Sequence, residues 1–332
     1  SVKKTRDSVT FSVINRTGAP IPIPVYGTKK GTMIFKQWLD IEECDSTFTV
    51  QRKEVDKIIL NLKNEVPEYN LRNNWKKLTG FFPNNRPVKF VFMKDLEDPY
   101  YNQILYVPTI SYNFYDGLTP GIRLHNKTIL DKPFIFEINP SYSSKSDNLS
   151  GSAIFVINQN YRNSTLYNAK YSMSGSYFHY AQDATYLKLN PTVQLRIRQP
   201  NFRDNRKQLI LFRQVIVNKE KSAFVTENSP ENYSVFDARY INTRTEVTNH
   251  FNFSSNIQVS GDFGKVIGEL EYRKLFENNR QINLRFYAGS FLYNKTQSDF
   301  FSFALDRPTD YLFDYNYFGR SESTGLFSQQ YI

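Results

Sequence analysis

Residues 185–199, TYLKLNPTVQLRIRQ, alternate between apolar and polar side chains along their whole length. One set of alternate positions holds Leu187, Leu189, Val193, Leu195 and Ile197. The positions between them hold Lys188, Asn190, Thr192, Gln194, Arg196 and Arg198. Successive side chains of a strand point to opposite faces, so the pattern predicts one extended strand with an apolar face and a charged face. An ordinary strand averages about 5–6 residues, and this run is much longer.

The same alternation recurs from residue 103 onward. It predicts about ten long strands, over residues 103–115, 117–129, 133–144, 150–161, 166–180, 184–198, 206–219, 238–259, 263–275 and 280–293. Apolar alternate positions include Val266, Leu270, Ile282, Leu284 and Phe286. The opposite positions hold Arg123, His125, Glu137, Arg244, Glu246, His250, Glu269, Glu271, Arg273 and Arg285. Residues 209–217, LILFRQVIV, are apolar in both sets except at Arg213 and Gln214, so their facing is ambiguous.

The first part of the chain has shorter strand patterns. Within residues 1–64, five of them cover residues 8–15, 21–27, 32–39, 46–52 and 56–63, and turn signals separate them. This spacing predicts a small β-sandwich-like module. Residues 65–102 form a connector that contains four prolines, with residues 70–78, NLRNNWKKL, as its one candidate for a helical turn. The long strands then occupy residues 103–332, which end without an evident closing strand, so this region is expected to be incomplete at its C-terminal end.

A transmembrane β-barrel explains the long alternating strands. No window reaches the 18 or more consecutive apolar residues that a membrane helix needs, so any crossing must use strands. In hydrocarbon every backbone polar group needs a partner, and strands achieve this by closing into a barrel. We therefore expect an all-β protein, with the module followed by an antiparallel barrel of about ten or more strands. The apolar set named above is expected to face lipid, and the charged set is expected to face the lumen.

The alternative is a large soluble β-protein whose apolar face packs on a second sheet. Strand length favours the barrel, because a tilted membrane strand needs about 9–11 residues. Short turns such as 116–117 and 277–279 alternate with longer polar connections such as 219–237, which is typical of outer-membrane barrels.

The charged face has two interpretations. About ten strands leave a narrow interior, since a barrel of about eight is filled by side chains and open pores need sixteen or more. We expect a filled or constricted lumen in which carboxylates and guanidinium groups pair. The alternative is that these charges lie unpaired in a water-filled lumen.

Composition and charge limit the classes of partner that the sequence favours. The chain has 42 Lys and Arg against 32 Asp and Glu, a net charge of +10. Because these basic residues are scattered through strand-like runs, the sequence favours a membrane over nucleic acid, and no nucleic-acid partner is expected. The strand-forming aromatic residues are abundant, with 23 Tyr and 28 Phe. Cys44 is the single cysteine, which excludes an internal disulfide and a cysteine metal site.

No catalytic motif is present in the 332 residues. The three histidines, His125, His179 and His250, do not stand in a zinc-binding spacing. There is no G-x-S-x-G and no phosphate-binding glycine loop. We therefore expect no catalytic residue, no metal site and no cofactor within this segment.

Four stretches resemble a known family. They are NRTGAPIPIPVYGTKKGTMIFKQW (15–38), PEYNLRNNWKKL (67–78), KDLEDPYYNQILYVPTISYNFYDGLTPGIRLHNKTI (94–129) and DYNYFGRSESTG (314–325). They are similar to the C-terminal, non-catalytic part of zinc metallopeptidases of the membrane alanyl aminopeptidase family from Bacteroidetes, in which a β-rich module and an outer-membrane barrel follow the catalytic part. The family's H-E-x-x-H has no counterpart in this chain. The resemblance implies that zinc and the active site lie upstream of Ser1.

These inferences predict an anchor in the bacterial outer membrane for a metallopeptidase-like protein. Its partners would be outer-membrane lipid and other outer-membrane proteins. The sequence leaves two alternatives open: a non-enzymatic subunit of an outer-membrane assembly or transport complex, and a pore for small solutes.

Overall fold

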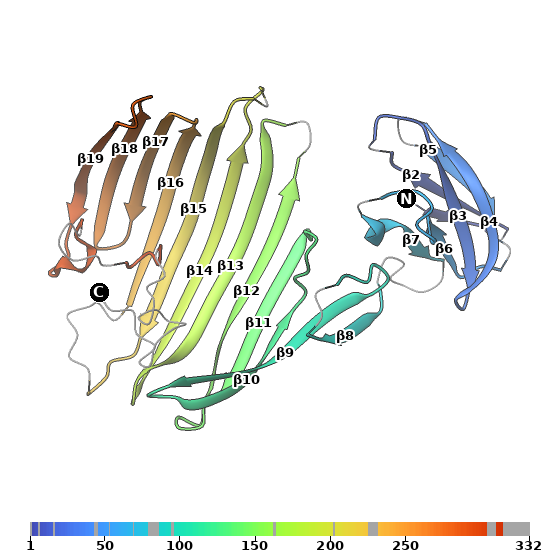
Figure 1. Ribbon diagram of the computed structural model, residues 1–332. Helices are drawn as coiled ribbons and strands as arrows, with labels where there is room; N and C mark the ends of the chain where they lie inside the picture. Colours follow the sequence, from blue (N-terminus) through green and yellow to red (C-terminus); the bar gives the residue numbers. More distant parts are fainter. Residues whose placement is uncertain are drawn as a thin grey trace. The chain divides into compact units, whose positions relative to one another are not determined.

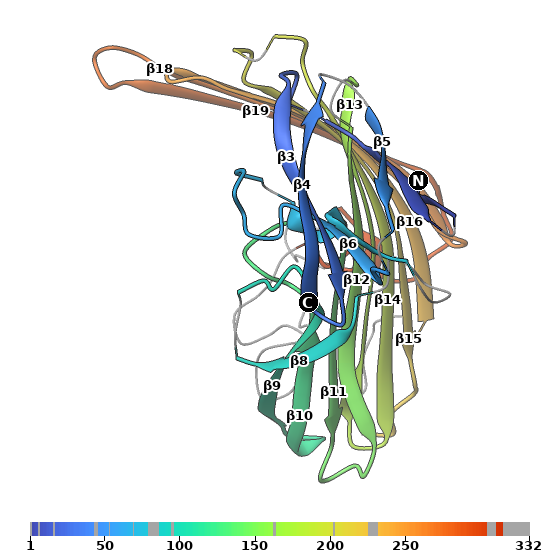
Figure 2. The same ribbon diagram turned by 90° about the vertical axis from the view of Figure 1, so that its right-hand side faces the viewer.

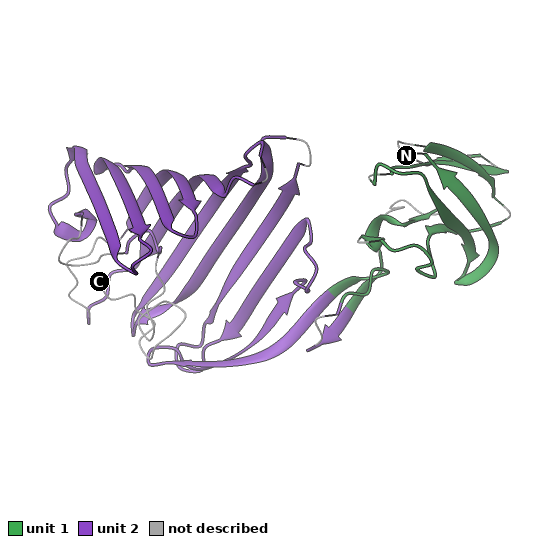
Figure 3. Ribbon diagram, turned by 45° about the horizontal axis from the view of Figure 1, so that its top comes forward, with its two compact units in different colours: residues 1–89, 97–103 green, residues 90–96, 104–332 purple. Residues whose placement is uncertain are grey.

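The computed structural model describes all of the chain except residues 1, 6, 16, 43–45, 53, 69, 79–85, 94–95, 162–163, 202, 225–231, 304–309 and 315–332. It divides into two compact units (Figure 3). Unit 1 comprises residues 1–89 and 97–103, and unit 2 comprises residues 90–96 and 104–332. Strands dominate both units, and the described residues contain no α-helix.

Unit 1 contains two small antiparallel sheets. The first has three strands, β1 (Val2–Lys4), β2 (Ser8–Val13) and β5 (Ser46–Gln51). The second has four, β4 (Thr32–Ile41), β3 (Ile21–Lys29), β6 (Lys57–Leu60) and β7 (Trp75–Lys77). One core joins them, because Val9 and Val50 of the first sheet cluster with Val25 and Ile58 of the second. Alternate apolar positions thus meet between two layers, as in a sandwich.

The segment predicted as a helical turn is only partly one. A 3-10 turn, η1 (Leu71–Asn73), follows Asn70, whose side chain accepts a hydrogen bond from the Arg72 amide. The chain then enters β7, whose pairing with β6 matches Trp75 to Ile59. The tertiary partner β6 therefore converts the second half of this segment to a strand.

Unit 2 is built on one sheet of twelve strands (Figure 1). The strands are β8 (Val88–Phe92), β9 (Asn102–Asn113), β10 (Gly117–His125), β11 (Phe134–Tyr142), β12 (Leu149–Asn160), β13 (Leu166–Ala181), β14 (Ala184–Ile197), β15 (Arg206–Lys219), β16 (Asn232–Thr245), β17 (Asn249–Val259), β18 (Phe263–Leu275) and β19 (Gln281–Asn294). A second 3-10 turn, η2 (Asp299–Phe301), follows β19.

Each strand of this sheet pairs with the next one along the chain, in an antiparallel meander. The strand direction rotates strongly from β9 to β19, so the sheet is twisted and curved (Figure 2). Within the described residues β8 and β19 are the two edges, and the sheet is not closed.

The prediction of one strand over residues 238–259 is wrong. The chain turns at residues 246–248, where the Glu246 amide donates to the Asn249 carbonyl at 2.7 Å, and β16 and β17 lie on either side. Residues 232–237, expected in a polar loop, are the start of β16. The alternation of apolar and polar residues continues across residues 246–248 with little interruption, so the pattern by itself does not predict the turn.

The expected asymmetry of connections is also not found. One end of the sheet has short turns at 114–116 and 182–183, but it also carries the long connection 220–231. The other end mixes the connection 198–205 with the short turn 246–248. Loop length therefore does not distinguish the two ends.

Candidate functional site: the two faces of the large sheet

One face of the sheet in unit 2 is apolar and exposed. Cross-strand partners share a face, so the register assigns every side chain to one side. The large apolar side chains that are more than a third exposed include, on this face, Ile110, Tyr112, Phe134, Phe155, Ile157, Met173, Phe212, Phe236, Ile257, Val266, Ile282, Leu284 and Phe286. We call this side the apolar face. Soluble monomers rarely expose a continuous apolar area of this extent.

All residues predicted to face lipid share the apolar face in the register. They are Leu187, Leu189, Val193, Leu195, Ile197, Val266, Leu270, Ile282, Leu284 and Phe286. Their contact with lipid stays a prediction. What the pairing establishes is that residues from β14, β18 and β19 lie on one side of one sheet.

The opposite side, which we call the polar face, holds most of the residues predicted to line a lumen. They are Arg123, His125, Glu137, Lys188, Arg196, His250, Glu269, Glu271, Arg273 and Arg285. Arg198 follows the end of β14, and Glu246 lies in the turn after β16.

Arg244 is the exception and requires a correction. It pairs with Phe251, so it lies on the apolar face instead of beside His250. The reason is the turn at residues 246–248. After this turn, odd-numbered residues of β17 pair with even-numbered residues of β16, so even-numbered residues of the two strands lie on opposite faces. Arg244 lies one residue from the end of β16 and forms an ion pair with Glu246 at 2.7 Å.

Charges on the polar face pair with one another. Arg123 contacts Glu137 at 2.8 Å, and Arg285 contacts Glu269 at 2.5 Å. These pairs connect neighbouring strands, since β10 pairs with β11 and β18 with β19. Opposite charges on one face therefore stabilise the register of the neighbouring strands.

A segment after β19 returns and packs on the polar face. We call its described residues, 299–303 and 310–314, the inner segment. Phe301, Tyr311 and Leu312 are buried in one cluster with Val215, Val235 and other strand residues. Gly289 leaves space for this segment, because a Cβ there would lie 2.5 Å from the Phe303 ring. The polar face thus has an apolar patch at one end of the strands, and the chain covers that patch itself.

An ion network fixes the inner segment. Arg213 contacts Asp237 at 2.7 Å and Asp314 at 2.8 Å, and donates to the Leu312 carbonyl at 3.2 Å. Arg239 contacts the second oxygen of Asp314 at 2.8 Å. The Asp237 side chain is 0% exposed and that of Arg213 is 8% exposed, so this is a buried network. Removing one partner of such a network leaves an uncompensated buried charge.

Lys265 makes a second attachment. It is 2% exposed, and its Nζ donates to the Phe301 carbonyl at 2.9 Å. Four aromatic rings surround this ammonium, those of Phe263, Phe291, Phe303 and Tyr311, at 4.9–5.6 Å from their centroids. The Tyr311 hydroxyl in turn donates to Gln258 of β17 at 2.5 Å. Cation–π attraction and carbonyl acceptors together replace the water that the ammonium loses.

The sequence reasoning missed this site. The pattern leaves the facing of Arg213 ambiguous and places Asp237 in the polar connection 219–237. A signal does exist: the aromatic runs FFSF at 300–303 and YLF at 311–313 follow the last alternating strand without alternation of their own. Apolar clusters outside any strand must be buried against something, and the polar face is what they cover.

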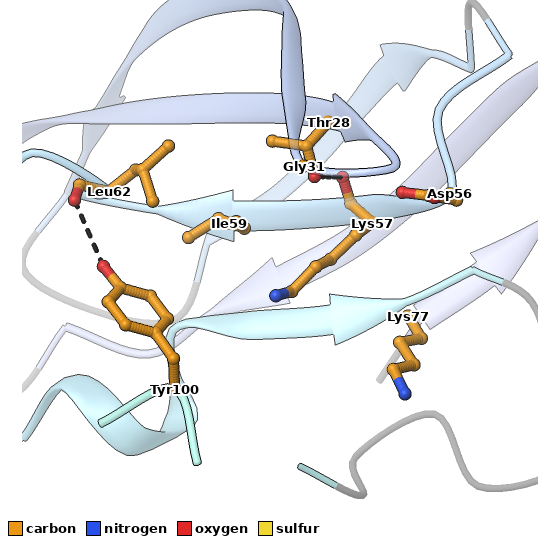
Figure 4. Close-up of a pocket in the computed structure, with 8 residues that line it drawn as sticks. All are labelled: Thr28, Gly31, Asp56, Lys57, Ile59, Leu62, Lys77 and Tyr100. Atoms are coloured by element: carbon orange, nitrogen blue, oxygen red, sulfur yellow. Dashed lines mark hydrogen bonds between the residues drawn. The ribbon is translucent and has the colours of Figure 1, made fainter. Parts of the chain in front are cut away.

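Unit 1 contains a separate pocket of about 520 Å³ (Figure 4). Its lining includes Lys57, Lys77 and Tyr100. The Tyr100 hydroxyl donates to the Leu62 carbonyl at 3.1 Å. Burial lowers the pKa of Lys57, and the nearby Lys77 charge lowers it further. Burial likewise raises the pKa of the Tyr100 phenol, with a smaller contribution from Asp98.

The other buried titratable pair is structural. His179 contacts Asp116 at 2.8 Å, and the same carboxylate accepts from Asn113 and Ser146. These hydrogen bonds attach the turn between β9 and β10 to the end of β13.

The described residues contain no cluster of three or more His, Cys, Asp or Glu side chains that could hold a metal ion. Nor does that part of the chain contain a helix that is long and apolar enough to cross a membrane. Cys44 and most of the stretch 314–325 lie outside the described residues.

Comparison with known proteins identifies no family for this chain. No protein-family model matches the chain, and no curated protein matches it. Among solved structures it is similar to the translocation pore of the P pilus usher PapC, at 9% identity, over 85% of this chain and 70% of that chain. The TM-score is 0.21, so this likeness does not establish a common fold.

Proposed function

We propose that the long strands of unit 2 form the wall of an outer-membrane β-barrel, and that this barrel is an anchor without a catalytic centre of its own. The observation that carries the proposal is the apolar face, which runs along the sheet and stays exposed in the folded chain. Hydrocarbon is the solvent that matches such a face, and the paired charges of the opposite face suit an enclosed interior.

The inner segment favours an anchor over a pore for small solutes. It covers part of the polar face with aromatic side chains and attaches there through Arg213, Arg239 and Lys265. A conducting lumen needs a continuous water-filled path, and this segment occupies part of that space.

What the barrel anchors is proposed from the family resemblance alone. The four stretches that resemble the C-terminal part of the alanyl aminopeptidase family support a metallopeptidase-like protein whose catalytic part lies upstream of Ser1. An H-E-x-x-H motif encoded before Ser1 is the expected observation. A different class of domain at that place would refute this part of the proposal and leave the barrel untouched.

The barrel itself can be tested with two neighbouring positions of β12. Phe155 lies on the apolar face and Ile154 on the polar face. Both are apolar, and their exposed fractions are nearly equal, 40% and 38%. Single cysteines at these positions, in a Cys44→Ser background, would be labelled with an environment-sensitive fluorophore in lipid vesicles.

A lipid-borne quencher is expected to quench the label at Phe155→Cys strongly and the label at Ile154→Cys weakly. The two positions differ only in facing, so each is the control of the other. Equal quenching, or a chain that stays soluble without detergent or lipid, would overturn the barrel.

A further inference from the structure

The pocket of unit 1 is lined by two lysines on neighbouring strands. Lys57 of β6 and Lys77 of β7 are cross-strand partners, so their side chains share one face. Figure 4 shows them on these two strands, with Tyr100 on the other side of Lys57. Like charges in directly opposite positions repel one another, and a sheet normally avoids this arrangement.

Neither ammonium group has an ion-pair partner in the part of the chain that the structure describes, although the charge of Asp56 attracts Lys57 at longer range. Among the described residues no carboxylate lies within ion-pairing distance of Lys57 or Lys77. Asp56 lies at the pocket wall, but its carboxylate accepts the Lys30 amide at 2.8 Å and holds the turn between β3 and β4. The pocket therefore has a local excess of positive charge.

The aromatic surroundings restrain Lys57 further. Its Nζ lies 4.3 Å from the centroid of the Trp75 ring and 6.0 Å from that of Tyr100. Trp75 is buried, so the ammonium rests on a fixed surface instead of swinging freely into water. A half-buried charge in a fixed place is preorganised for a ligand of opposite charge.

We propose that this pocket binds a phosphomonoester, with the phosphate between Lys57 and Lys77. Lysine suits phosphate as a point charge, and two ammonium groups match the double negative charge of a monoester better than the single charge of a carboxylate. The pocket, of about 520 Å³, is larger than phosphate alone. Ile59, Leu62 and the Tyr100 ring give the remaining wall an apolar surface for the group that carries the phosphate.

Phenyl phosphate and benzoate are matched probes, because they share a ring and differ in anion. Calorimetric titration of the whole chain in a non-ionic detergent is expected to show phenyl phosphate binding about tenfold or more tightly than benzoate. The variant K57Q/K77Q is expected to lose phenyl phosphate binding. The control K3Q/K63Q removes the same charge from exposed positions outside the pocket and is expected to bind as the original chain does.

Equal affinity for the two probes, or unchanged binding by K57Q/K77Q, would overturn the proposal. Near-ultraviolet circular dichroism checks that the Trp75 environment is intact in each variant. Vesicles with and without phosphatidic acid then separate two sources of the same chemistry. If vesicles that contain phosphatidic acid compete with phenyl phosphate, the site is assigned to a lipid headgroup. If they do not compete, the site is assigned to a soluble phosphomonoester. None of these results depends on whether unit 2 is a barrel.

Discussion

At the scale of single residues, Asp237 and Arg213 are the most consequential charges of the large sheet. Both are buried, and Arg213 joins β16 to the inner segment through Asp237 and Asp314. Exposed pairs such as Arg285 with Glu269 have similar distances but a different energetic role, because water already solvates Arg285, which is 67% exposed. The two ion pairs therefore differ in burial and not in contact distance.

Arg213→Ala is therefore expected to lower the free energy of unfolding by about 3–5 kcal/mol, since it leaves Asp237 charged and buried. Arg285→Ala, the control, is expected to cost about 0–1 kcal/mol. Urea titrations of the refolded chain in lipid vesicles measure both. Equal losses would show that the network around Arg213 is not buried in solution.

Lys57 allows a prediction about pH. Its pKa is lowered below the ordinary 10.5, first by burial and second by Lys77. Between the folded pKa and 10.5 the unfolded chain holds the proton more firmly, so the free energy of unfolding rises with pH across this window. Lys77→Gln removes one cause and is expected to raise the Lys57 pKa and narrow the window. Titration of the lysine side-chain signals by NMR measures the shift, and an unchanged Lys57 pKa would contradict the cause assigned to Lys77.

At the scale of elements, the strand pattern decides the two faces of the sheet. Leu270 of β18 pairs with Phe253 and Phe286, all on the apolar face. Asn283 of β19 pairs with Arg273 on the polar face. A shift of one position along the strand therefore moves a side chain to the other face of the sheet, as the period of two requires.

Leu270→Arg or Leu284→Arg is expected to destabilise the chain by about 2–4 kcal/mol if these positions lie near the membrane midplane. Asn283→Arg places the same side chain on the polar face of the same hairpin and is expected to be far milder. Refolding titrations into lipid vesicles compare the three variants. Similar penalties at all three would contradict the facing.

At the scale of the whole molecule, the inner segment ties the end of the described chain back to β14–β18. Its described contacts reach strands more than 70 residues earlier, such as Arg239 with Asp314 and Tyr233 with Tyr311. Each such contact closes a large loop of chain, and the conformational entropy lost on closure opposes its formation. The position of the inner segment is thus fixed by strands that are distant from it in the sequence.

Asp314→Arg sets a positive charge against Arg213 and Arg239 and is expected to release residues 310–314 from the polar face. Amide hydrogen exchange of Tyr311, Leu312 and Phe313 should then accelerate, while exchange in β16 stays slow. Asp299→Arg makes the same change of charge in the inner segment, away from the two arginines that bind Asp314, and serves as control. No acceleration in Asp314→Arg would show that packing alone holds the segment.

The sequence by itself determined most of the strands and the grouping of side chains on each. Alternation is a local property, and the period of two converts directly into faces, as Leu187 to Ile197 on β14 illustrate. Five of the seven strands of unit 1 and most of the long strands of unit 2 needed no further information, whereas β1, β7 and β8 lie outside the predicted strands. The absence of a catalytic motif could also be read directly from the residues.

Only the tertiary structure decided three other features. It divided residues 238–259 at a turn and so moved Arg244 to the apolar face. It brought Arg213, Asp237, Arg239 and Asp314 together, and it placed Lys57 opposite Lys77. The physical reason is the same in each case: register and ion pairing depend on how a second strand lies alongside the first, and the periodicity of one strand holds no information about its neighbour.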